Sequence, residues 1–314
     1  MHVHTLTQDL ILPTFSELEL IEPLQRAVAA KQYTVPTPIQ AQAIPPLLAG
    51  RDVLGCAQTG TGKTAAFTLP VLQHIEARRP ARTGRRAIRA LVLTPTRELA
   101  AQIGDNVQEY ARYLSVPHAV IFGGVNQGPQ VRQLQRGLDL LIATPGRLLD
   151  LMDQGYVDLS AVEFFVLDEA DRMLDMGFIR DVKKVLAVLP KQRQNLLFSA
   201  TMPESIVELA SSFLNDPVRI EVTPQASTVE KVSQSIMFCS KTDKPTLLAW
   251  LIKREKVESA IVFTRTKHGA NRLVQQLERS GISAAAIHGN KSQGARTRAL
   301  DGFKAGDVPI LVAT

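Results

Sequence analysis

A glycine-rich loop between an apolar strand and a helix is the first feature of the sequence that could do chemistry. The segment 52–56 predicts a strand, and the residues after it read Ala-Gln-Thr-Gly-Thr-Gly-Lys-Thr. Glycines allow backbone N–H groups to fold around phosphate oxygens, and the N-terminus of the following helix adds partial positive charge. We therefore expect a nucleotide to bind Ala57, Gln58, Thr59, Gly60, Thr61, Gly62, Lys63 and Thr64.

Two side chains at the end of this loop carry the functional groups that a nucleotide site requires. The Lys63 amine would reach the β and γ phosphates, and the Thr64 hydroxyl would ligate Mg²⁺. Ala57 stands where the general pattern of such loops has glycine. The strand before the loop and the helix after it still favour a phosphate site over a glycine turn without a ligand.

An acidic pair follows a second apolar strand about a hundred residues later. The run Phe164–Leu167 ends in Asp168 and Glu169. Asp168 would hold the Mg²⁺ shell, while Glu169 could orient and deprotonate an attacking water. Acids at a strand end are usually only solvated, but together with the glycine-rich loop they predict nucleotide hydrolysis, with Lys63, Asp168 and Glu169 as the catalytic residues.

Both motifs belong to a regular alternation of strands and helices. The other predicted strands of the first two thirds of the chain are apolar along most of their length: Ala90–Thr94, Ala119–Phe122, Leu138–Ala143, Asn195–Phe198 and Val218–Val222. Helical patterns separate them, with start signals such as Thr37 before Pro38, and Pro203 before the run 204–214. Apolar strands separated by helices predict an α/β fold with a parallel sheet covered on both faces.

A polar segment then interrupts the pattern. Residues 223–228 contain a proline and have no periodicity, so we expect a linker there. The alternation resumes afterwards, with a helix over 271–280 closed by Gly281. The predicted strands of this second α/β unit are Ser235–Cys239, Ala260–Thr264, Ala284–His288 and Pro309–Ala313.

Composition excludes several classes of protein. The 314 residues are 45% hydrophobic and 21% charged, which is ordinary globular usage. The sequence has no apolar run long enough to cross a membrane, and Met1–Thr5 lacks the features of a secretory signal. With only Cys56 and Cys239, a disulfide framework is excluded, and we expect a cytoplasmic location.

The excess positive charge lies at one end of the chain. Residues 235–314 contain 13 Lys and Arg against 6 Asp and Glu, whereas residues 1–234 contain 23 against 24. This distribution suits a surface that faces a polyanion, although lysines that only keep the surface soluble would give the same count. Six arginines within 78–89 allow the same two readings, and the absence of aromatic residues favours a solvated connector.

The sequence of the acidic motif resembles that of a known family. The quartet Asp168-Glu169-Ala170-Asp171 reads D-E-A-D, and the chain resembles the DEAD-box RNA helicases of superfamily 2. Further segments resemble motifs of that family in order and spacing: Thr37–Gln40, Pro95–Ala100, Gly123–Gly124, Thr144–Arg147, Ser199–Thr201, Ile261–Thr266 and Gln293–Arg296. The run 287–296 most resembles bacterial RhlE-type members. The match extends over nearly the whole chain from Phe15 onward.

The resemblance implies an adenine pocket. The planar Gln40 amide matches the donor and acceptor on the adenine edge, Tyr33 could stack on the base, and Phe15 could close the pocket or only pack in the core. The family usually has glycine where Gln32 stands, which puts the local turn in question. Asp171, Ser199 and Thr201 would couple the hydrolysis site to neighbouring elements, because the two hydroxyls leave a strand end and can hydrogen-bond the acidic motif.

The resemblance also implies a grip on the RNA backbone. Arginines, small hydroxyls and backbone N–H groups just past strand ends bind phosphates without reading bases. The implied RNA-binding residues are Pro95, Thr96, Arg97, Gly123, Gly124, Thr144, Gly146, Arg147, Thr264, Arg265, Gln293 and Arg296. The resemblance implies RNA rather than DNA as the partner, since no feature of the sequence itself reads a 2′-hydroxyl.

The expected organisation is two RecA-like parallel-sheet domains, the second incomplete. Residues 1–14 would be an N-terminal extension, 15–222 the ATP-binding domain, 223–234 the linker and 235–314 a truncated C-terminal domain. The chain stops within a motif and before the family's arginine fingers, so we expect a fragment that binds nucleotide and scarcely hydrolyses it. ATP and Mg²⁺ are the implied cofactors. RNA, and ribonucleoprotein complexes containing it, are the implied partners of a monomer.

Three alternatives to an RNA helicase remain at this point. A DNA translocase of the same superfamily would share the phosphate loop but lack the Tyr33 and Gln40 block. A guanine-nucleotide switch would need an N-K-x-D motif, and the residues 290–293 read N-K-S-Q. A passive scaffold that binds RNA and nucleotide would lack turnover. The RNA target, in ribosome assembly or in mRNA turnover, stays open.

Overall fold

The chain forms two compact units, which divide between residues 229 and 230. The structure is a computed structural model and describes residues 14–78, 86–222 and 233–314. Most of the predicted N-terminal extension and most of the predicted linker therefore lie outside the described residues. Each unit is considered by itself below.

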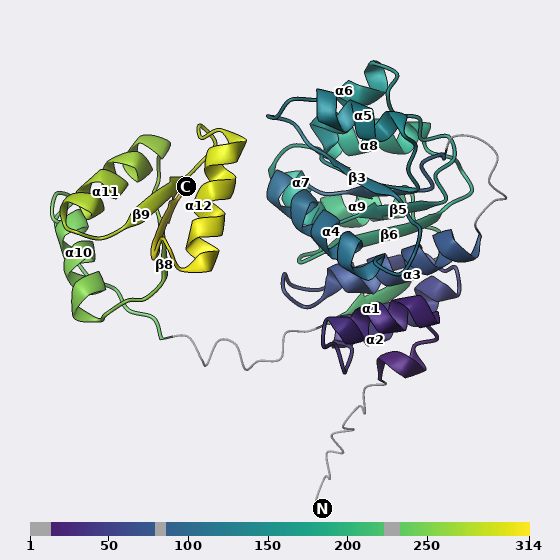
Figure 1. The fold of residues 1–314 in the computed structure, drawn as a ribbon, viewed down its shortest axis with the longest axis horizontal. Helices are drawn as coiled ribbons and strands as arrows, with labels where there is room; N and C mark the ends of the chain where they lie inside the picture. Colours follow the sequence, from purple (N-terminus) through teal and green to yellow (C-terminus); the bar gives the residue numbers. More distant parts are fainter. Residues whose placement is uncertain (1–13, 79–85, 223–232) are drawn as a thin grey trace, which may run out of the picture. The chain divides into compact units, whose positions relative to one another are not determined.

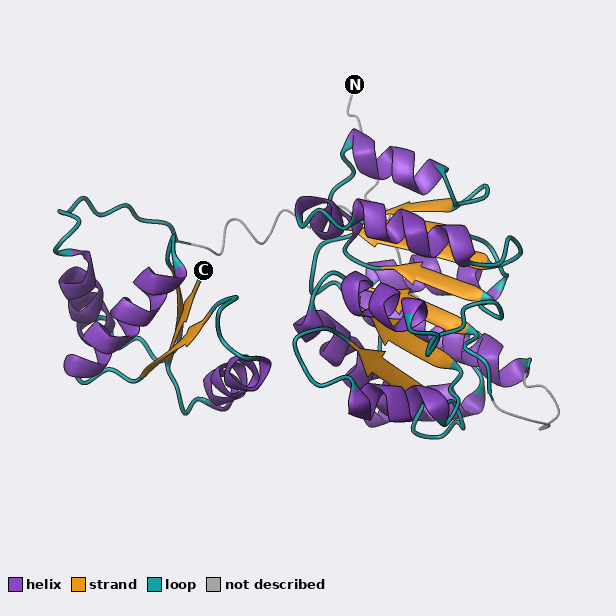
Figure 2. Ribbon diagram, turned by 90° about the horizontal axis from the view of Figure 1, so that it is seen from above, coloured by secondary structure: helices purple, strands orange, loops and turns teal. Residues whose placement is uncertain are grey.

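A parallel sheet of seven strands forms the centre of the first unit (Figures 1 and 2). Its spatial order is β3-β4-β2-β5-β6-β1-β7, and every pairing is parallel. The strands are β1 (Val53–Cys56), β2 (Ala90–Leu93), β3 (His118–Ile121), β4 (Leu140–Ala143), β5 (Phe164–Leu167), β6 (Gln194–Ser199) and β7 (Val218–Glu221). All seven lie where the sequence predicted strands.

Helices cover both faces of this sheet, as the apolar strands require (Figure 2). One face packs against the short helix η1 (Phe15–Glu17), α1 (Glu22–Ala30), α2 (Pro38–Leu48), α3 (Lys63–Ala77) and α4 (Arg97–Tyr110). The opposite face packs against α5 (Gly128–Gln135), α6 (Pro145–Asp153), α7 (Ala170–Asp175), α8 (Ile179–Val188) and α9 (Glu204–Ser211). Alternate residues of β2 enter the two cores, Val92 one and Leu93 the other.

Local signals in the sequence set several helix starts. Thr37 is the N-cap of α2, with Pro38 at the first helical position, and Pro203 is the N-cap of α9. Thr96 caps α4, because its Oγ1 accepts a hydrogen bond of 3.2 Å from the Leu99 N–H. These caps fix where each helix begins relative to the strand end before it. None of the helices within the described part of the chain is long and apolar enough to cross a membrane.

The second unit contains a parallel sheet of three strands in the order β8-β10-β9. These strands are β8 (Ala260–Phe263), β9 (Ala284–Ile287) and β10 (Ile310–Ala313). The unit also contains α10 (Lys244–Arg254), α11 (Lys267–Arg279) and α12 (Gln293–Ala305). Gly281 follows the end of α11 with a φ of 75°, so the predicted glycine stop of this helix is confirmed.

One predicted strand of the second unit is wrong. Residues 235–239 are assigned to no strand, and the described sheet contains only β8, β9 and β10. Phe238 is 96% exposed and Ile236 83% exposed. An apolar segment forms a strand only when a neighbouring strand and a core lie beside it. In the described part of this unit, neither lies beside residues 235–239.

Candidate functional site

The order of the strands sorts the predicted site residues into two groups. The glycine-rich loop, the acidic motif and the segment Ser199–Thr201 lie at the carboxyl ends of β1, β5 and β6, which are adjacent in the sheet. The other predicted nucleotide residues, Phe15, Tyr33 and Gln40, lie on or beside η1, α1 and α2. Residues predicted to bind RNA follow β3, β4 and β2, which are also adjacent. Because all seven strands are parallel, these ends meet at one edge of the sheet. The boundary between the two groups lies between β2 and β5.

The glycine-rich loop leads from β1 into α3, as predicted. Lys63 is the first residue of α3, is only 7% exposed, and donates a hydrogen bond of 2.8 Å from Nζ to the Ala57 carbonyl. Gln58, Thr59 and Gly60 are exposed. The Thr61 hydroxyl donates a hydrogen bond of 2.7 Å to the Gln58 carbonyl. The loop thus closes on itself while its outer residues stay accessible.

Asp168 directly follows β5 and is almost fully buried. It is 2% exposed, and its Oδ1 accepts a hydrogen bond of 3.0 Å from the Glu169 N–H. Burial, opposed by Lys63 and aided by the nearby Glu169 carboxylate, raises the pKa of Asp168 to about 6. A cation beside Asp168 would restore its charged form, so its environment fits a metal ligand.

Glu169 has a backbone conformation that few residues other than glycine adopt. Its φ is 51°, it is the N-cap of α7, and it is 8% exposed. Its carboxylate forms an ion pair of 3.1 Å with Arg172. Strained backbone of this kind persists when surrounding contacts hold it, and it is frequent at functional sites. The sequence analysis did not single out Arg172, although its spacing of three residues from Glu169 on a helix was visible.

Hydrogen bonds connect the acidic motif to the end of β6. Thr201 donates to Asp171 Oδ2 from both its N–H and its Oγ1, each over 2.9 Å. The Asp171 N–H donates to Ser199 Oγ over 3.2 Å, and that hydroxyl donates to the Thr201 carbonyl over 2.7 Å. Burial works to raise the pKa of Asp171, but the hydrogen bonds from Thr201 and the Arg172 N–H outweigh it and hold the pKa below its usual value. The structure brings these three predicted coupling residues together.

Gln40 lies between its own helix start and the glycine-rich loop. Its Oε1 accepts a hydrogen bond of 2.9 Å from the Thr37 N–H, and its Nε2 donates one of 3.1 Å to the Gly62 carbonyl. Gly62 has a φ of 96°, and a Cβ there would overlap the Gln40 amide. Any side chain at position 62 would therefore displace Gln40.

Tyr33 and Phe15 form a stacked pair beside this glutamine's helix. Their ring centroids lie 6.2 Å apart with an angle of 26° between the ring planes. Phe15 is 5% exposed and belongs to the core, whereas Tyr33 is half-buried. Gln32 adopts a φ of 59°, so the turn before Tyr33 forms with glutamine where the family usually has glycine. The packing of Phe15 therefore supports Tyr33 from one side.

The predicted RNA-binding residues of the first unit surround one loop. Arg97 lies against the backbone of Gly124, whose φ is 76°, and a Cβ at Gly124 would overlap the Arg97 guanidinium. Gly123 lies beside the same guanidinium. Thr96 caps the helix that carries Arg97, and Pro95, before it, is buried.

Arg147 approaches the same loop from α6. Its Nη2 donates a hydrogen bond of 3.1 Å to the Val125 carbonyl, and its Nη1 donates one of 3.1 Å to Gln130 Oε1. Thr144, the N-cap of α6, is 8% exposed, while Gly146 is exposed with open space around it. Gln130 was missed in the sequence analysis, because a single glutamine on a helix has no signature.

The remaining predicted RNA-binding residues belong to the second unit. Thr264 and Arg265 follow β8, while Gln293 and Arg296 lie in the first turn of α12 after β9. The Thr264 hydroxyl donates to the Thr266 and Ala313 carbonyls over 3.2 and 3.3 Å, and Arg265 is exposed. These residues also follow the carboxyl ends of parallel strands.

The described arginines of the segment 78–89 form ion pairs within the first unit. Arg89 is 8% exposed and lies 2.6 Å from Glu163, Arg86 pairs with Asp139, and Arg78 lies 3.5 Å from Glu163. The other arginines of that segment lie outside the described residues. These contacts give the three described arginines a structural role.

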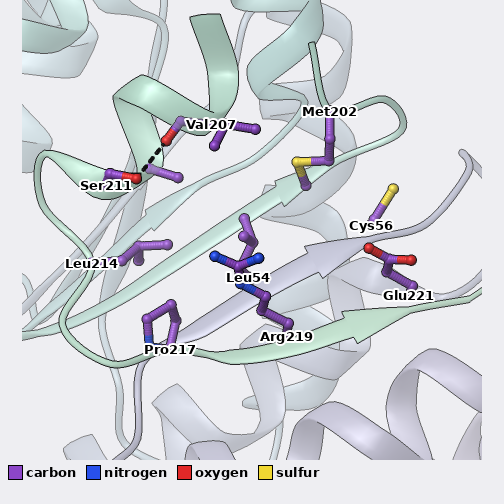
Figure 3. Close-up of a pocket in the computed structure, with 10 residues that line it drawn as sticks. Leu54, Cys56, Met202, Val207, Ser211, Leu214, Pro217, Arg219 and Glu221 are labelled. Carbon is purple, nitrogen blue, oxygen red and sulfur yellow. Dashed lines mark hydrogen bonds between the residues drawn. The ribbon is translucent and has the colours of Figure 1, made fainter. Parts of the chain in front are cut away.

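A cavity of about 340 Å³ lies between α9 and the strands β1 and β7 (Figure 3). Apolar side chains such as Leu54, Val207 and Leu214 line it, together with the charged residues Arg219 and Glu221. None of the predicted site residues is among its lining residues. The cavity is therefore separate from the candidate site at the strand ends.

Comparison with known families covers most of the chain. Residues 37–209 match the model described as DEAD/DEAH box helicase, and residues 243–314 match the helicase conserved C-terminal domain. The chain is 41% identical over 302 residues to ATP-dependent RNA helicase DeaD of Klebsiella pneumoniae, and 42% identical over 301 residues to ATP-dependent RNA helicase DBP2 of Encephalitozoon cuniculi. Each alignment covers 96% of this chain, but only 46% and 61% of those two relatives.

Solved structures give the same relationship. A DEAD box protein from Methanococcus jannaschii is 35% identical with a TM-score of 0.63, over 96% of this chain and 80% of that one. Dbp5 of S. cerevisiae, bound to RNA and ADP BeF3, is 31% identical with a TM-score of 0.83, over 96% and 75%. The predicted RecA-like fold of the two parallel-sheet units is confirmed, while the resemblance to RhlE-type members stays a prediction. The chain belongs to the DEAD/DEAH box helicase family.

Proposed function

We propose that this chain binds ATP with Mg²⁺ and binds RNA, and that RNA-stimulated ATP hydrolysis is coupled to local, sequence-independent unwinding of RNA duplexes. The observation that carries the proposal is the division of one sheet edge into two adjacent groups of strand ends. Relatives named ATP-dependent RNA helicases, and the Dbp5 structure with RNA and ADP BeF3, support the same assignment.

The buried residues of the first group would serve the nucleotide. Lys63 would exchange its hydrogen bond with the Ala57 carbonyl for phosphate oxygens, and Gln40 would present its amide to the adenine edge beside Tyr33. The Thr64 hydroxyl and the Asp168 carboxylate would hold Mg²⁺, partly through water. When bound, Mg²⁺ neutralises charge that develops on the phosphate oxygens.

Glu169 would act as the base. Glu169 directly follows Asp168 in the sequence, and the ion pair with Arg172 orients the Glu169 carboxylate. From there it would orient the attacking water and accept its proton. The residues after β3, β4 and β2 would hold RNA phosphates, which predicts weak sequence preference and binding that falls steeply with salt.

The contacts around Asp171 would connect the two activities. Ser199 and Thr201 hold Asp171, which lies in the first turn of α7, two residues after Glu169. Movement of the β6 end would therefore reach the hydrolysis residues through these hydrogen bonds. Ribonucleoprotein complexes as partners, a monomeric state and a cytoplasmic location complete the proposal, the last supported by the free thiols of Cys56 and Cys239.

The proposal is tested by binding and turnover together. ATP and single-stranded RNA should both bind the wild-type chain, and Lys63→Ala should lose ATP. Glu169→Gln should keep ATP binding and abolish the weak hydrolysis that we expect of this chain. Failure of the wild-type chain to bind ATP or RNA would refute the proposal, and hydrolysis at the wild-type rate in Glu169→Gln would remove Glu169 from its proposed role.

A further inference from the structure

Gln130, on α5, joins two segments that are far apart in the sequence. Its Nε2 donates a hydrogen bond of 3.1 Å to the Phe122 carbonyl, which lies just before Gly123 and Gly124. Its Oε1 accepts a hydrogen bond of 3.1 Å from Arg147 on α6. Both polar ends of one amide are therefore used, one toward the loop 122–125 and the other toward Arg147.

These contacts are buried, which makes them sensitive to substitution. Gln130 is 7% exposed, and the Arg147 side chain is 11% exposed. Arg147 also donates a hydrogen bond to the Val125 carbonyl, at the other end of the same loop. Its Nε lies 3.4 Å from Asp150 Oδ2, which forms an ion pair with it. An unpaired polar group at a buried position costs more free energy than the same group in water. Gln130, Arg147 and the loop 122–125 therefore hold one another in position.

Arg97 holds the loop from another side. Its guanidinium lies against the Gly124 backbone, where a Cβ would overlap it. The loop 122–125 thus lies in contact with two arginines, Arg97 through Gly124 and Arg147 through Val125. If these groups bind phosphates, their spacing must match the spacing of phosphates along the strand.

We propose that Gln130 is a positioning residue for RNA binding, which fixes the loop 122–125 relative to Arg147 so that both meet the RNA backbone without rearrangement. This inference rests on the proposed function, since it assumes that the loop and Arg147 belong to the RNA site. Gln130 itself contacts no phosphate in this role; it acts through Phe122 and Arg147. Its removal lowers RNA affinity because the binding geometry is no longer formed in advance.

A second set of contacts between the same two helical regions provides a matched control. Gln127, at the N-cap of α5, exchanges hydrogen bonds of 2.9 and 3.3 Å with Gln154, which also donates to Asp150 over 2.8 Å. These contacts join the start of α5 to the end of α6, whereas the hydrogen bond between Gln130 and Arg147 joins the first turns of the two helices. They touch neither the Phe122 carbonyl nor Arg147.

The test measures RNA affinity of the full chain with a fluorescent single-stranded uridine oligonucleotide, at a temperature well below thermal unfolding. Gln130→Met, which keeps the size and loses both hydrogen bonds, should weaken binding about tenfold. Gln130→Glu can still accept from Arg147 but cannot donate to Phe122, so its affinity should fall between wild type and Gln130→Met. Gln127→Met should bind RNA as wild type does.

Three further measurements separate positioning from a general loss of structure. ATP affinity should be equal in all variants, since Gln127 and Gln130 form their hydrogen bonds with none of the predicted nucleotide residues. The slope of log affinity against log salt should fall by about 0.7 for each phosphate contact that Gln130→Met loses. In Gln130→Met combined with Arg147→Met, the losses should be less than additive, because both changes break the same contact.

Failure of the proposed role of Gln130 gives a different result from failure of the proposed RNA binding. If wild type binds no RNA, both are overturned. If wild type binds RNA and Gln130→Met matches it, only the inference is overturned. Additive losses in the double variant, or a Gln127→Met variant as weak as Gln130→Met, would also overturn it. Should Gln130→Met fail to fold, Gln130→Glu decides the question: weaker RNA binding with wild-type ATP affinity supports the inference, and wild-type RNA affinity overturns it.

Discussion

Thr201 donates two hydrogen bonds to one oxygen of Asp171, although 30 residues separate them in the chain. The Thr201 N–H and Oγ1 each lie 2.9 Å from Asp171 Oδ2. Asp171 follows β5 and Thr201 follows β6, which are neighbours in the sheet. The contact therefore fixes the acidic motif to the next strand end.

Thr201→Val should raise the pKa of Asp171. The substitution keeps the shape and the N–H but removes the Oγ1 donor, while the opposing effect of burial remains. An NMR titration of the Asp171 carboxyl carbon measures the shift, with the exposed Thr297→Val as control. An unchanged pKa would mean that the hydroxyl does not stabilise the charged carboxylate.

The same change gives a stability difference that depends on pH. Wild type should exceed Thr201→Val by about 1 kcal/mol at neutral pH, the usual worth of one hydrogen bond. Because the folded pKa of Asp171 lies below its ordinary value, this stabilisation is present above the unfolded pKa of about 3.9 and is lost as pH falls through the folded pKa. Denaturant unfolding at pH 7 and below pH 3 checks the sign.

Gln40→Glu should weaken ATP binding and reduce the preference for ATP over GTP. The carboxylate can accept from the Thr37 N–H but cannot donate to the Gly62 carbonyl or to an adenine acceptor. We expect a loss of about 1–3 kcal/mol in ATP affinity, the cost of an unpaired buried group. Nucleotide titrations measure it, with the exposed Gln42→Glu on the same helix as control. Equal ATP and GTP affinities in wild type would contradict the adenine assignment.

The sequence predicted the first unit better than the second, and the reason is packing. The strands of the large sheet are apolar and lie between two helical layers, so local pattern and burial agree at each of them. Residues 235–239 have the same apolar pattern, but side chains such as Phe238 meet no core among the described residues. A strand needs a neighbour, and the local sequence does not state which segment that neighbour is.

The sequence likewise predicted only part of the candidate site. The glycine-rich loop and the acidic motif were predictable, because their chemistry fixes residue types at fixed spacing. Gln130 was not, because any polar residue with suitable reach can supply a hydrogen bond from a helix. Its role follows from distances across the fold, such as the 3.1 Å between Gln130 and Arg147. Supporting contacts of this kind depend on tertiary structure alone.

Asp52→Asn should destabilise the first unit far more than Asp216→Asn. Asp52 is 7% exposed, and its Oδ1 and Oδ2 accept hydrogen bonds of 2.8 Å from the Asn195 and Asn215 N–H groups respectively. In asparagine one of these two oxygens becomes an amide nitrogen, which cannot accept from the N–H group that faces it. We expect a loss of about 2–3 kcal/mol in the free energy of unfolding. Asp216, whose side chain is 89% exposed, pairs with Arg51 at the surface, so its loss should cost at most about 1 kcal/mol. Denaturant unfolding compares the two variants, and similar losses would contradict the importance assigned to burial.

Gly124→Ala should weaken RNA binding, whereas Gly155→Ala should not. Both glycines are left-handed, with φ of 76° and 75°, so alanine should cost each about 1 kcal/mol of stability. They differ in their surroundings, because a Cβ at Gly124 would overlap the Arg97 guanidinium and a Cβ at Gly155 would meet nothing within 4 Å. The Gly124→Ala substitution therefore displaces Arg97 in addition to straining the backbone.

The two variants share the backbone strain, so a difference between them measures the effect of displacing Arg97. Thermal unfolding should give similar losses of stability for the two, while RNA titration should give about tenfold weaker binding for Gly124→Ala alone, as expected when one charged hydrogen bond is lost. If both variants bind RNA as wild type does, the contact between Gly124 and Arg97 has no part in RNA binding. If both weaken equally, the effect comes from strain, since only the substitution at Gly124 reaches the Arg97 guanidinium.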